Sequence, residues 1–156
     1  MKAKAGFTLI ELLVVMTIII ILSGTALATF LNYQQKRQVQ DDASSVAERL
    51  RTVQIKATAV EIPAGCDGVT NYVVTFAAAN LTVAATCPGV GSVAVSGLTL
   101  MLTNSVFQSS PFTITFDSRT VSASPATINI CGNNILYRVE VSASANVGRP
   151  VFVGSC

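Results

Sequence analysis

The sequence contains no histidine and no tryptophan, and only 12% of its 156 residues are charged. Histidine is the commonest general base and the commonest metal ligand, so its absence removes the usual basis for both kinds of site. A typical soluble domain carries roughly a quarter charged residues, about twice the fraction found in this chain. Hydrophobic residues make up 51% of the chain, which excludes global disorder. The length suits one domain of ordinary size.

Charge of one sign is also scarce beyond the first few residues. The net charge of +2 comes from Lys2 and Lys4, because without them 8 basic residues face 8 acidic residues. From residue 62 onward three bases, Arg119, Arg138 and Arg149, accompany three acids. This region therefore has no field of one sign to attract nucleic acid or anionic lipid, and we do not expect nucleic acid as a partner.

Four cysteines, Cys66, Cys87, Cys131 and Cys156, all follow the apolar N-terminal region. None forms a CxxC pair and no histidine is present to complete a mixed zinc site, so we expect no metal; a site made of all four cysteines would be unusual. Two disulfides are the simpler interpretation if this region is exported. Four cysteines allow three connectivities. Local geometry favours Cys66–Cys87 and Cys131–Cys156, because each pair brackets one candidate hairpin.

One long apolar run covers residues 7–31, in which Glu11 is the only charge. At about 1.5 Å per residue, a helix of this length covers roughly 37 Å, enough to cross the hydrocarbon core of a bilayer. The lysines ahead of the run predict a cytoplasmic N-terminus and an exported C-terminal region.

Helical periodicity continues beyond the apolar run. Apolar residues recur at steps of three and four, which predicts an amphipathic helix over residues 32–61 that ends at Pro63 and Gly65. The stripe consists of Val39, Ala43, Val46, Ala47, Leu50, Val53 and Ala57. We therefore expect one helix of roughly 50 residues, whose second half packs on the rest of the chain.

Short β-like runs alternate with turn signals in residues 62–156. The expected strands cover residues 72–76, 81–86, 98–103, 112–116, 126–130, 135–143 and 150–153. Turns are expected at residues 78–80, 88–91, 117–119, 132–134 and 146–148. The sequence thus predicts an α+β fold, in which the long N-terminal helix packs on an antiparallel β-sheet or small β-sandwich head.

The most specific stretch is residues 6–11, Gly-Phe-Thr-Leu-Ile-Glu, between a short basic stub and the apolar run. With this combination the sequence resembles the type IV pilin superfamily. The resemblance implies that residues 1–6 form a leader, that prepilin peptidase cuts after Gly6, and that the new N-terminal residue, Phe7, is N-methylated. Unlike the apolar part of a secretory signal peptide, residues 7–31 would stay with the mature protein.

Glu11 has two compatible interpretations. Thr8 at the N-cap and Glu11 three residues later match a capping box ahead of an apolar run. A carboxylate in a lipid-facing segment is also costly, and it usually has a partner or a function. The pilin resemblance implies that Glu11 meets the positive N-terminal amine of a neighbouring subunit during assembly. A cap would fix the position of that carboxylate.

Three stretches of the head, residues 112–119, 126–131 and 137–142, resemble the C-terminal half of H-type minor pseudopilins and the related FimT-type minor pilins. This implies a minor structural subunit of a type IV pilus or of a type II secretion pseudopilus. These families usually have a glycine three residues after the Phe-Asp turn, where this sequence has Thr120. A major filament-forming pilin remains the alternative, since a Cys131–Cys156 disulfide would form the C-terminal loop common among them.

The resemblance also implies partners and a location. The partners are other pilin or pseudopilin subunits, prepilin peptidase, the inner-membrane assembly platform and, before assembly, membrane lipid. The protein would cross the bacterial inner membrane once, with an exported head, before it joins a pilus or pseudopilus. An alternative of another class is a DNA-binding minor pilin for DNA uptake, for which Arg138 and Arg149 are the available bases. We expect no enzyme and no cofactor, because the sequence offers no nucleophile–base pair or carboxylate pair.

Overall fold

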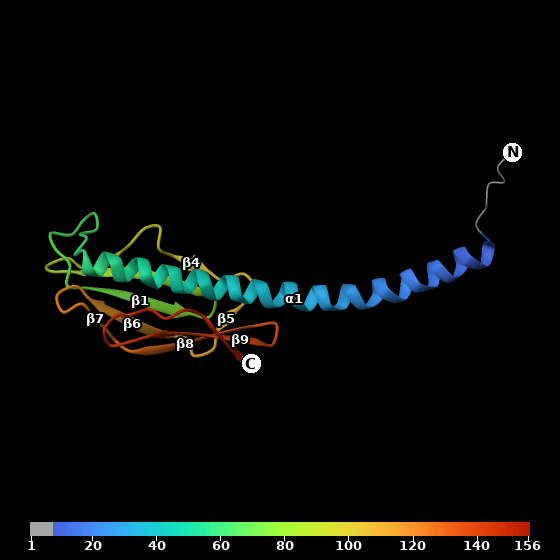
Figure 1. Cartoon of the computed structure of the whole chain (residues 1–156). Helices are drawn as coiled ribbons and strands as arrows, with labels where there is room; N and C mark the ends of the chain where they lie inside the picture. Colours follow the sequence, from blue (N-terminus) through green and yellow to red (C-terminus); the bar gives the residue numbers. More distant parts are fainter. Residues whose placement is uncertain (1–7) are drawn as a thin grey trace. The chain divides into compact units, whose positions relative to one another are not determined.

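The computed structural model describes residues 8–156, apart from the side chains of residues 23–28. Helix α1 (Leu9–Thr58) is followed by short strands that form two sheets (Figure 1). The chain divides into two units, residues 1–35 and residues 36–156, and the division falls within α1. The predicted α+β class and the predicted helix of roughly 50 residues are confirmed, since α1 contains 50 residues.

All strand pairings within the described residues are antiparallel. The first sheet has the order β3-β2-β1-β6-β7, and β4 also pairs with β2. Its strands are β1 (Asn71–Ala77), β2 (Asn80–Cys87), β3 (Gly91–Ala94), β4 (Leu100–Met101), β6 (Phe112–Asp117) and β7 (Ser122–Ala123). The second sheet has the order β10-β9-β8-β5. Its strands are β5 (Val106–Phe107), β8 (Ala126–Gly132), β9 (Ile135–Val141) and β10 (Val151–Gly154).

Alternation along the central strands gives each sheet one buried face. In β1 the side chains of Tyr72, Val74 and Phe76 are buried, whereas most of their neighbours along the strand are only half-buried. The register places Val74 opposite Val83 of β2 and Ile114 of β6, which are also buried. Because side chains two residues apart share a face, these pairings form continuous apolar rows.

The second half of α1 lies along the strands of the head (Figure 1). Its predicted stripe belongs to the same core. Every member of the stripe is at most 2% exposed: Val39, Ala43, Val46, Ala47, Leu50, Val53 and Ala57. Gly132, at the end of β8, lies close to this helix. A Cβ at Gly132 would lie 3.0 Å from Cγ2 of Val39 and 2.3 Å from the carbonyl oxygen of Asn104, so this approach requires glycine.

Charged residues beside the stripe bind backbone groups of the head. Oδ2 of Asp42 accepts hydrogen bonds from the backbone N–H of Asn104 at 3.1 Å and from Oγ of Ser105 at 2.8 Å. Nη2 of Arg51 donates to the carbonyl oxygen of Gly148 at 3.1 Å. These bonds satisfy polar groups next to the core and fix the position of the helix.

Helix α1 ends at Thr58, before the predicted limit at residue 61. Val60 has a positive φ of 50°, and its N–H donates to the carbonyl oxygen of Ala57. The N–H of Glu61 donates to the carbonyl oxygen of Lys56 at 3.0 Å. This pair of bonds is a Schellman motif, which stops the helix ahead of the predicted Pro63 and Gly65. The sequence did not reveal it, because a β-branched residue rarely takes the left-handed position.

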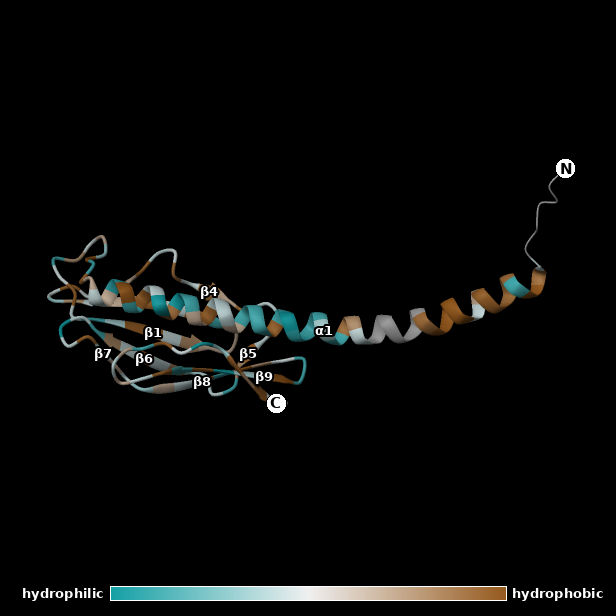
Figure 2. Cartoon of the chain, in the orientation of Figure 1, coloured by the Kyte–Doolittle hydropathy of each residue, from teal (hydrophilic) through white to brown (hydrophobic). Residues whose placement is uncertain are grey.

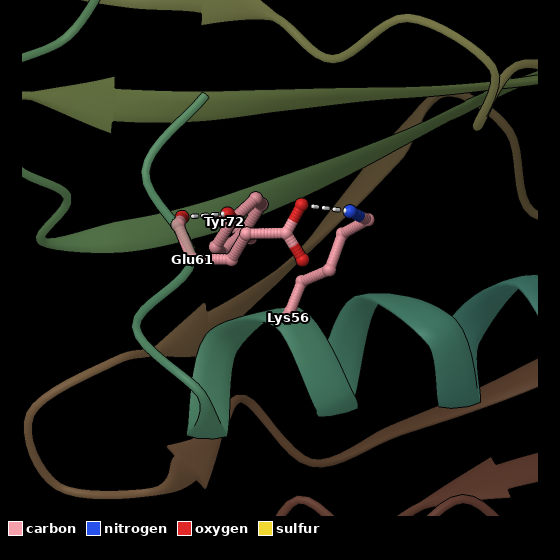
Figure 3. A network of polar contacts seen from close by, with 3 residues as sticks. All are labelled: Lys56, Glu61 and Tyr72. Atoms are coloured by element: carbon pink, nitrogen blue, oxygen red, sulfur yellow. Dashed lines mark hydrogen bonds and ion pairs between the residues drawn. The ribbon is translucent and has the colours of Figure 1, made fainter. Parts of the chain in front are cut away.

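A polar network joins the end of α1 to β1 (Figure 3). The ammonium group of Lys56 forms an ion pair with the carboxylate of Glu61, and the hydroxyl of Tyr72 donates to the carbonyl oxygen of Glu61. Burial raises the pKa of the Tyr72 phenol, and the negative charge of Glu61 raises it further. Lys56 also lies in the last helical turn, where a positive charge interacts favourably with the helix dipole.

The strand prediction was incomplete for the shortest elements. The predicted strand at residues 98–103 is reduced to β4, and β3, β5 and β7 were not predicted. The predicted strand at residues 135–143 ends earlier, at Val141. Such short strands exist because longer strands such as β2, β8 and β6 offer them pairing partners, and local sequence carries little of that information.

Candidate assembly segment and head surface

Thr8 caps the N-terminus of α1. It precedes the first helical residue, Leu9, and its Oγ1 accepts a hydrogen bond from the backbone N–H of Glu11 at 3.3 Å. This is the N-cap bond of the predicted capping box, and it satisfies one of the free N–H groups of the first turn. The negative charge of Glu11 in this turn also interacts favourably with the helix dipole. Gly6 and Phe7, the predicted cleavage and methylation positions, lie outside the described residues.

Apart from a short hydrophilic stretch, the first turns of α1 are strongly apolar (Figure 2). Twelve large apolar side chains are between 48% and 83% exposed: Leu9, Ile10, Leu12, Leu13, Val14, Val15, Met16, Ile18, Ile19, Ile20, Ile21 and Leu22. The hydroxyl of Thr17 lies 2.8 Å from the carbonyl oxygen of Leu13 and 2.9 Å from that of Val14, so it is satisfied within the helix. Glu11 is then the one ionisable group between Thr8 and Leu22.

The predicted membrane span covers residues 7–31. Phe7 and the side chains of residues 23–28 belong to the part that the structure does not describe. Within the described residues, we find no helix with the length and apolarity that a membrane crossing requires.

Two disulfides join segments of the head. Cys66 is bonded to Cys87, with 5.5 Å between their Cα atoms, and Cys131 is bonded to Cys156, with 6.0 Å between their Cα atoms. These are the pairs that the spacing favoured. The first ties the segment after α1 to the end of β2, and the second ties the end of the chain to β8. The described residues hold no group of three or more His, Cys, Asp or Glu side chains suited to a metal ion.

Arg138 and Arg149, the two bases considered for DNA binding, line one pocket of about 280 Å³ beside β10. Glu140 lines the same pocket. Nε of Arg138 also donates to Oδ1 of Asn129 at 3.4 Å. The carboxylate of Glu140 therefore offsets part of the positive charge of Arg138 and Arg149. Binding of a polyanion such as DNA depends on several cations, which this pocket does not offer.

A comparison with protein families gives one match, which lies in the N-terminal region. The family model described as a prokaryotic N-terminal methylation motif matches residues 1–27. The chain has a type IV pilin-like N-terminus. No curated protein and no solved structure matches the chain. The motif is that of prepilins, which prepilin peptidase processes and which assemble with other pilin subunits, and it indicates a structural subunit.

Beyond this pilin-like N-terminus, the exposure of β10 was not predicted from the sequence. Residues 150–153 were predicted as a strand, and a continuous apolar run usually indicates a buried one. In the structure Val151, Phe152 and Val153 are 59%, 48% and 43% exposed. Nζ of Lys36 lies 4.1 Å from the centre of the Phe152 ring. Because Lys36 and Phe152 lie far apart in the sequence, no local pattern predicts this contact.

Proposed function

We propose that the protein is a structural subunit of a type IV pilus or of a type II secretion pseudopilus. The observation that carries the proposal is the methylation motif at residues 1–27, which runs into a helix that is apolar on all sides. Removing its twelve exposed side chains from water would contribute on the order of 20–30 kcal/mol. A helix that is apolar to this extent suits lipid first and then the apolar helices of neighbouring subunits.

The proposed maturation begins with hydrolysis of the peptide bond between Gly6 and Phe7. Residues 1–6 leave as a leader, and the free amine of Phe7 then accepts one methyl group. Residues 7–31 cross the inner membrane once, residues 32–58 continue the helix, and residues 62–156 form the exported head. The lysines of the leader support this orientation, because positive charge favours the cytoplasmic side.

Glu11 is the proposed assembly residue. A methylated amine still carries a positive charge, so the N-terminus of one subunit can neutralise the Glu11 carboxylate of a neighbour. An unpaired carboxylate in hydrocarbon costs several kcal/mol, so this pairing would favour correct register over slipped arrangements. The N-cap bond to Thr8 holds the first turn of the helix, and with it the backbone of Glu11, in place.

We further propose a minor subunit of the H-type or FimT-type. This rests on the resemblance of residues 112–119, 126–131 and 137–142, which belong largely to β6 of the first sheet and to the paired strands β8 and β9 of the second. The Cys131–Cys156 disulfide is the feature that suits a major pilin instead. The two alternatives differ in abundance within filaments, which is measurable.

Intact mass of the native protein tests processing and abundance together. The protein would be taken from sheared surface filaments and from membranes of the same cells. We expect the mass of residues 7–156 plus one methyl group, found sparsely and mainly in membranes. The same mass in quantity in the sheared fraction would replace the minor role with a major one. An uncleaved chain in cells with active peptidase would contradict the proposed function.

Two substitutions separate processing from assembly. Gly6→Ala should block cleavage, and Glu11→Gln should allow cleavage but abolish incorporation into filaments. Glu140→Gln is the matched control, because Glu140 is an exposed carboxylate of the head that no assembly role requires. Wild-type incorporation of the Glu11→Gln variant, measured against the control by immunoblot of sheared filaments, would sink the assembly role.

A further inference from the structure

Strand β10 is an apolar edge of the second sheet. It pairs with β9 only, and its other edge has no strand partner among the described residues. Its three consecutive apolar residues Val151, Phe152 and Val153 form a surface that we call the β10 ridge, and each is more than 40% exposed. Single exposed apolar residues are ordinary, but a row of three on an unpaired edge suits an interaction surface.

The β10 ridge lies close to the point where the apolar run of the chain ends. Nζ of Lys36 is 4.1 Å from the centre of the Phe152 ring. Lys36 follows Leu31, the last residue of the apolar run, by five residues. Five residues span at most about 18 Å, even when fully extended. If residues 7–31 are anchored in lipid, the ridge is therefore within that distance of the membrane surface, plus the reach of one lysine side chain.

Two aromatic residues lie near the end of the apolar run, a few residues before Lys36. Phe30 and Tyr33 flank the end of the apolar run. Aromatic side chains of this kind gather at the boundary between hydrocarbon and headgroups. The boundary would then fall near Phe30 and Tyr33, which brings Lys36, and with it the Phe152 ring, within a short length of chain from the headgroups.

Basic groups surround the β10 ridge. Arg37 lies near Tyr137 of β9; burial raises the pKa of the Tyr137 phenol, and the positive charge of Arg37 acts in the opposite direction. Arg138 and Arg149 line the pocket beside the ridge, together with the single carboxylate of Glu140. Lys36 and Arg37 come from α1 and are not part of the balanced count for residues 62–156, and with them four bases accompany one acid around the ridge. Apolar residues flanked by lysine and arginine are typical of surfaces that bind anionic bilayers.

We propose that the β10 ridge docks the head onto the anionic bilayer surface before assembly. Val151, Phe152 and Val153 enter the interface, and the surrounding basic side chains contact lipid phosphates. The inference rests on the proposed membrane anchoring of residues 7–31. Docking would hold the unassembled head against the membrane, and extraction of the subunit into a filament would release it.

The absence of tryptophan from the chain allows a direct test. A Phe152→Trp substitution introduces a single tryptophan on the β10 ridge, and a Val151→Trp substitution provides a second reporter at a 59% exposed site. Val90→Trp is the matched control, because Val90 is 57% exposed in the turn between β2 and β3. That turn is tied by the Cys66–Cys87 disulfide to the segment after α1, and the end of α1 at Thr58 lies about 33 Å along the helix from Lys36.

Full-length variants would be reconstituted in vesicles of phosphatidylcholine and phosphatidylglycerol that contain dibrominated lipids. We expect bromine quenching of both ridge reporters to exceed that of the Val90→Trp variant at least twofold. Quenching should weaken in 1 M salt or without phosphatidylglycerol, because headgroup attraction is then screened or absent. Near-UV circular dichroism identifies any variant whose head is misfolded. If one ridge variant is misfolded, the quenching of the other ridge variant tests the proposal.

Flotation of the same vesicles separates this inference from the proposed function. A chain that floats with the vesicles while all reporters are quenched equally, or not at all, would overturn membrane docking and leave the anchoring proposal intact. A chain that does not float would contradict anchoring itself. A ridge emission that shifts to the blue only as the protein-to-lipid ratio rises would assign the ridge to a second copy of the chain and overturn the lipid proposal.

Discussion

Leu13 and Leu50 belong to the same helix, yet their surroundings differ completely. Leu13 is 54% exposed and lies among apolar residues on every side of the helix, whereas Leu50 is fully buried between α1 and the sheets. The second half of α1 is therefore stabilised by the core of its own chain. The first half offers the same kind of side chain in an exposed setting, and under the proposed function lipid or other subunits would cover it. One helix thus combines a half whose apolar side chains are buried in a core with a half whose apolar side chains are exposed.

Reduction of the two disulfides should lower the stability of the head more than any of the substitutions below. The loops closed by Cys66–Cys87 and Cys131–Cys156 span 21 and 25 residues. Loops of this length contribute about 3 kcal/mol each through the entropy of the unfolded chain. We expect reductant to lower the unfolding midpoint of the full-length chain in detergent, as measured by circular dichroism. An unchanged midpoint would mean that the disulfides do not form in the protein.

A pair of leucine substitutions tests the comparison directly. Leu50→Ala should lower the free energy of unfolding of the head by about 3 kcal/mol, because it leaves a cavity in the core. Leu13→Ala should leave that free energy unchanged and should instead weaken incorporation into filaments. Denaturant unfolding of both variants in detergent provides the measurement. If both substitutions destabilised the head equally, the division of α1 into two roles would be wrong.

The polar network at the end of α1 should make a smaller contribution to the stability of the buried half of the helix. Tyr72→Phe removes the hydrogen bond to the carbonyl oxygen of Glu61, which should cost about 1 kcal/mol. Because the folded state raises the pKa of Tyr72, its contribution is fully present below the ordinary tyrosine pKa of about 10 and is lost as the pH rises through the folded pKa.

The pH dependence of unfolding provides a second readout for this variant. Wild-type stability should fall above about pH 10, and the fall should be smaller in the Tyr72→Phe variant. Some alkaline loss should remain, since burial raises the pKa of Tyr137 as well. Identical alkaline profiles for the two proteins would show that Tyr72 does not contribute.

The smallest expected effect is a gain at the helix terminus. Val60 has a positive φ and is 47% exposed, so Val60→Gly should relieve backbone strain with little loss of packing. We expect the head to gain about 1 kcal/mol. Val90→Gly is the control at an exposed valine for which no positive φ is found, and it should give no gain. A loss of stability in the Val60→Gly variant would contradict the assigned Schellman motif.

The sequence predicted the main elements of the head because their patterns are local. The stripe from Val39 to Ala57 follows the helical period, and the core of β6, β8 and β9 follows the period of two. The turn at residues 132–134 was also predicted, and Asn133 and Asn134 both adopt the positive φ that a tight hairpin requires. The candidate assembly segment was visible for the same reason, since residues 6–11 and the apolar run are contiguous.

The remaining features depend on contacts between distant residues. Strands β3, β5 and β7 form because a neighbouring strand offers free hydrogen-bonding groups, and nothing within two to four residues encodes that. The exposure of β10 was equally hidden, since an apolar strand looks the same in sequence whether it lies at the centre or at the edge of a sheet.

Local sequence was sufficient to predict a long helix behind a methylation motif, with a nearly continuous apolar run in its first half and an apolar stripe in its second. Those properties reside in the order of neighbouring residues, and local sterics and hydrophobic periodicity are sufficient to read them. Three features depend on tertiary packing: the positive φ of Val60 after the end of α1, the close approach of Gly132 to Val39, and the contact of Lys36 with the Phe152 ring. These arise from the packing of residues far apart in the chain, where the shape of the whole core selects one arrangement.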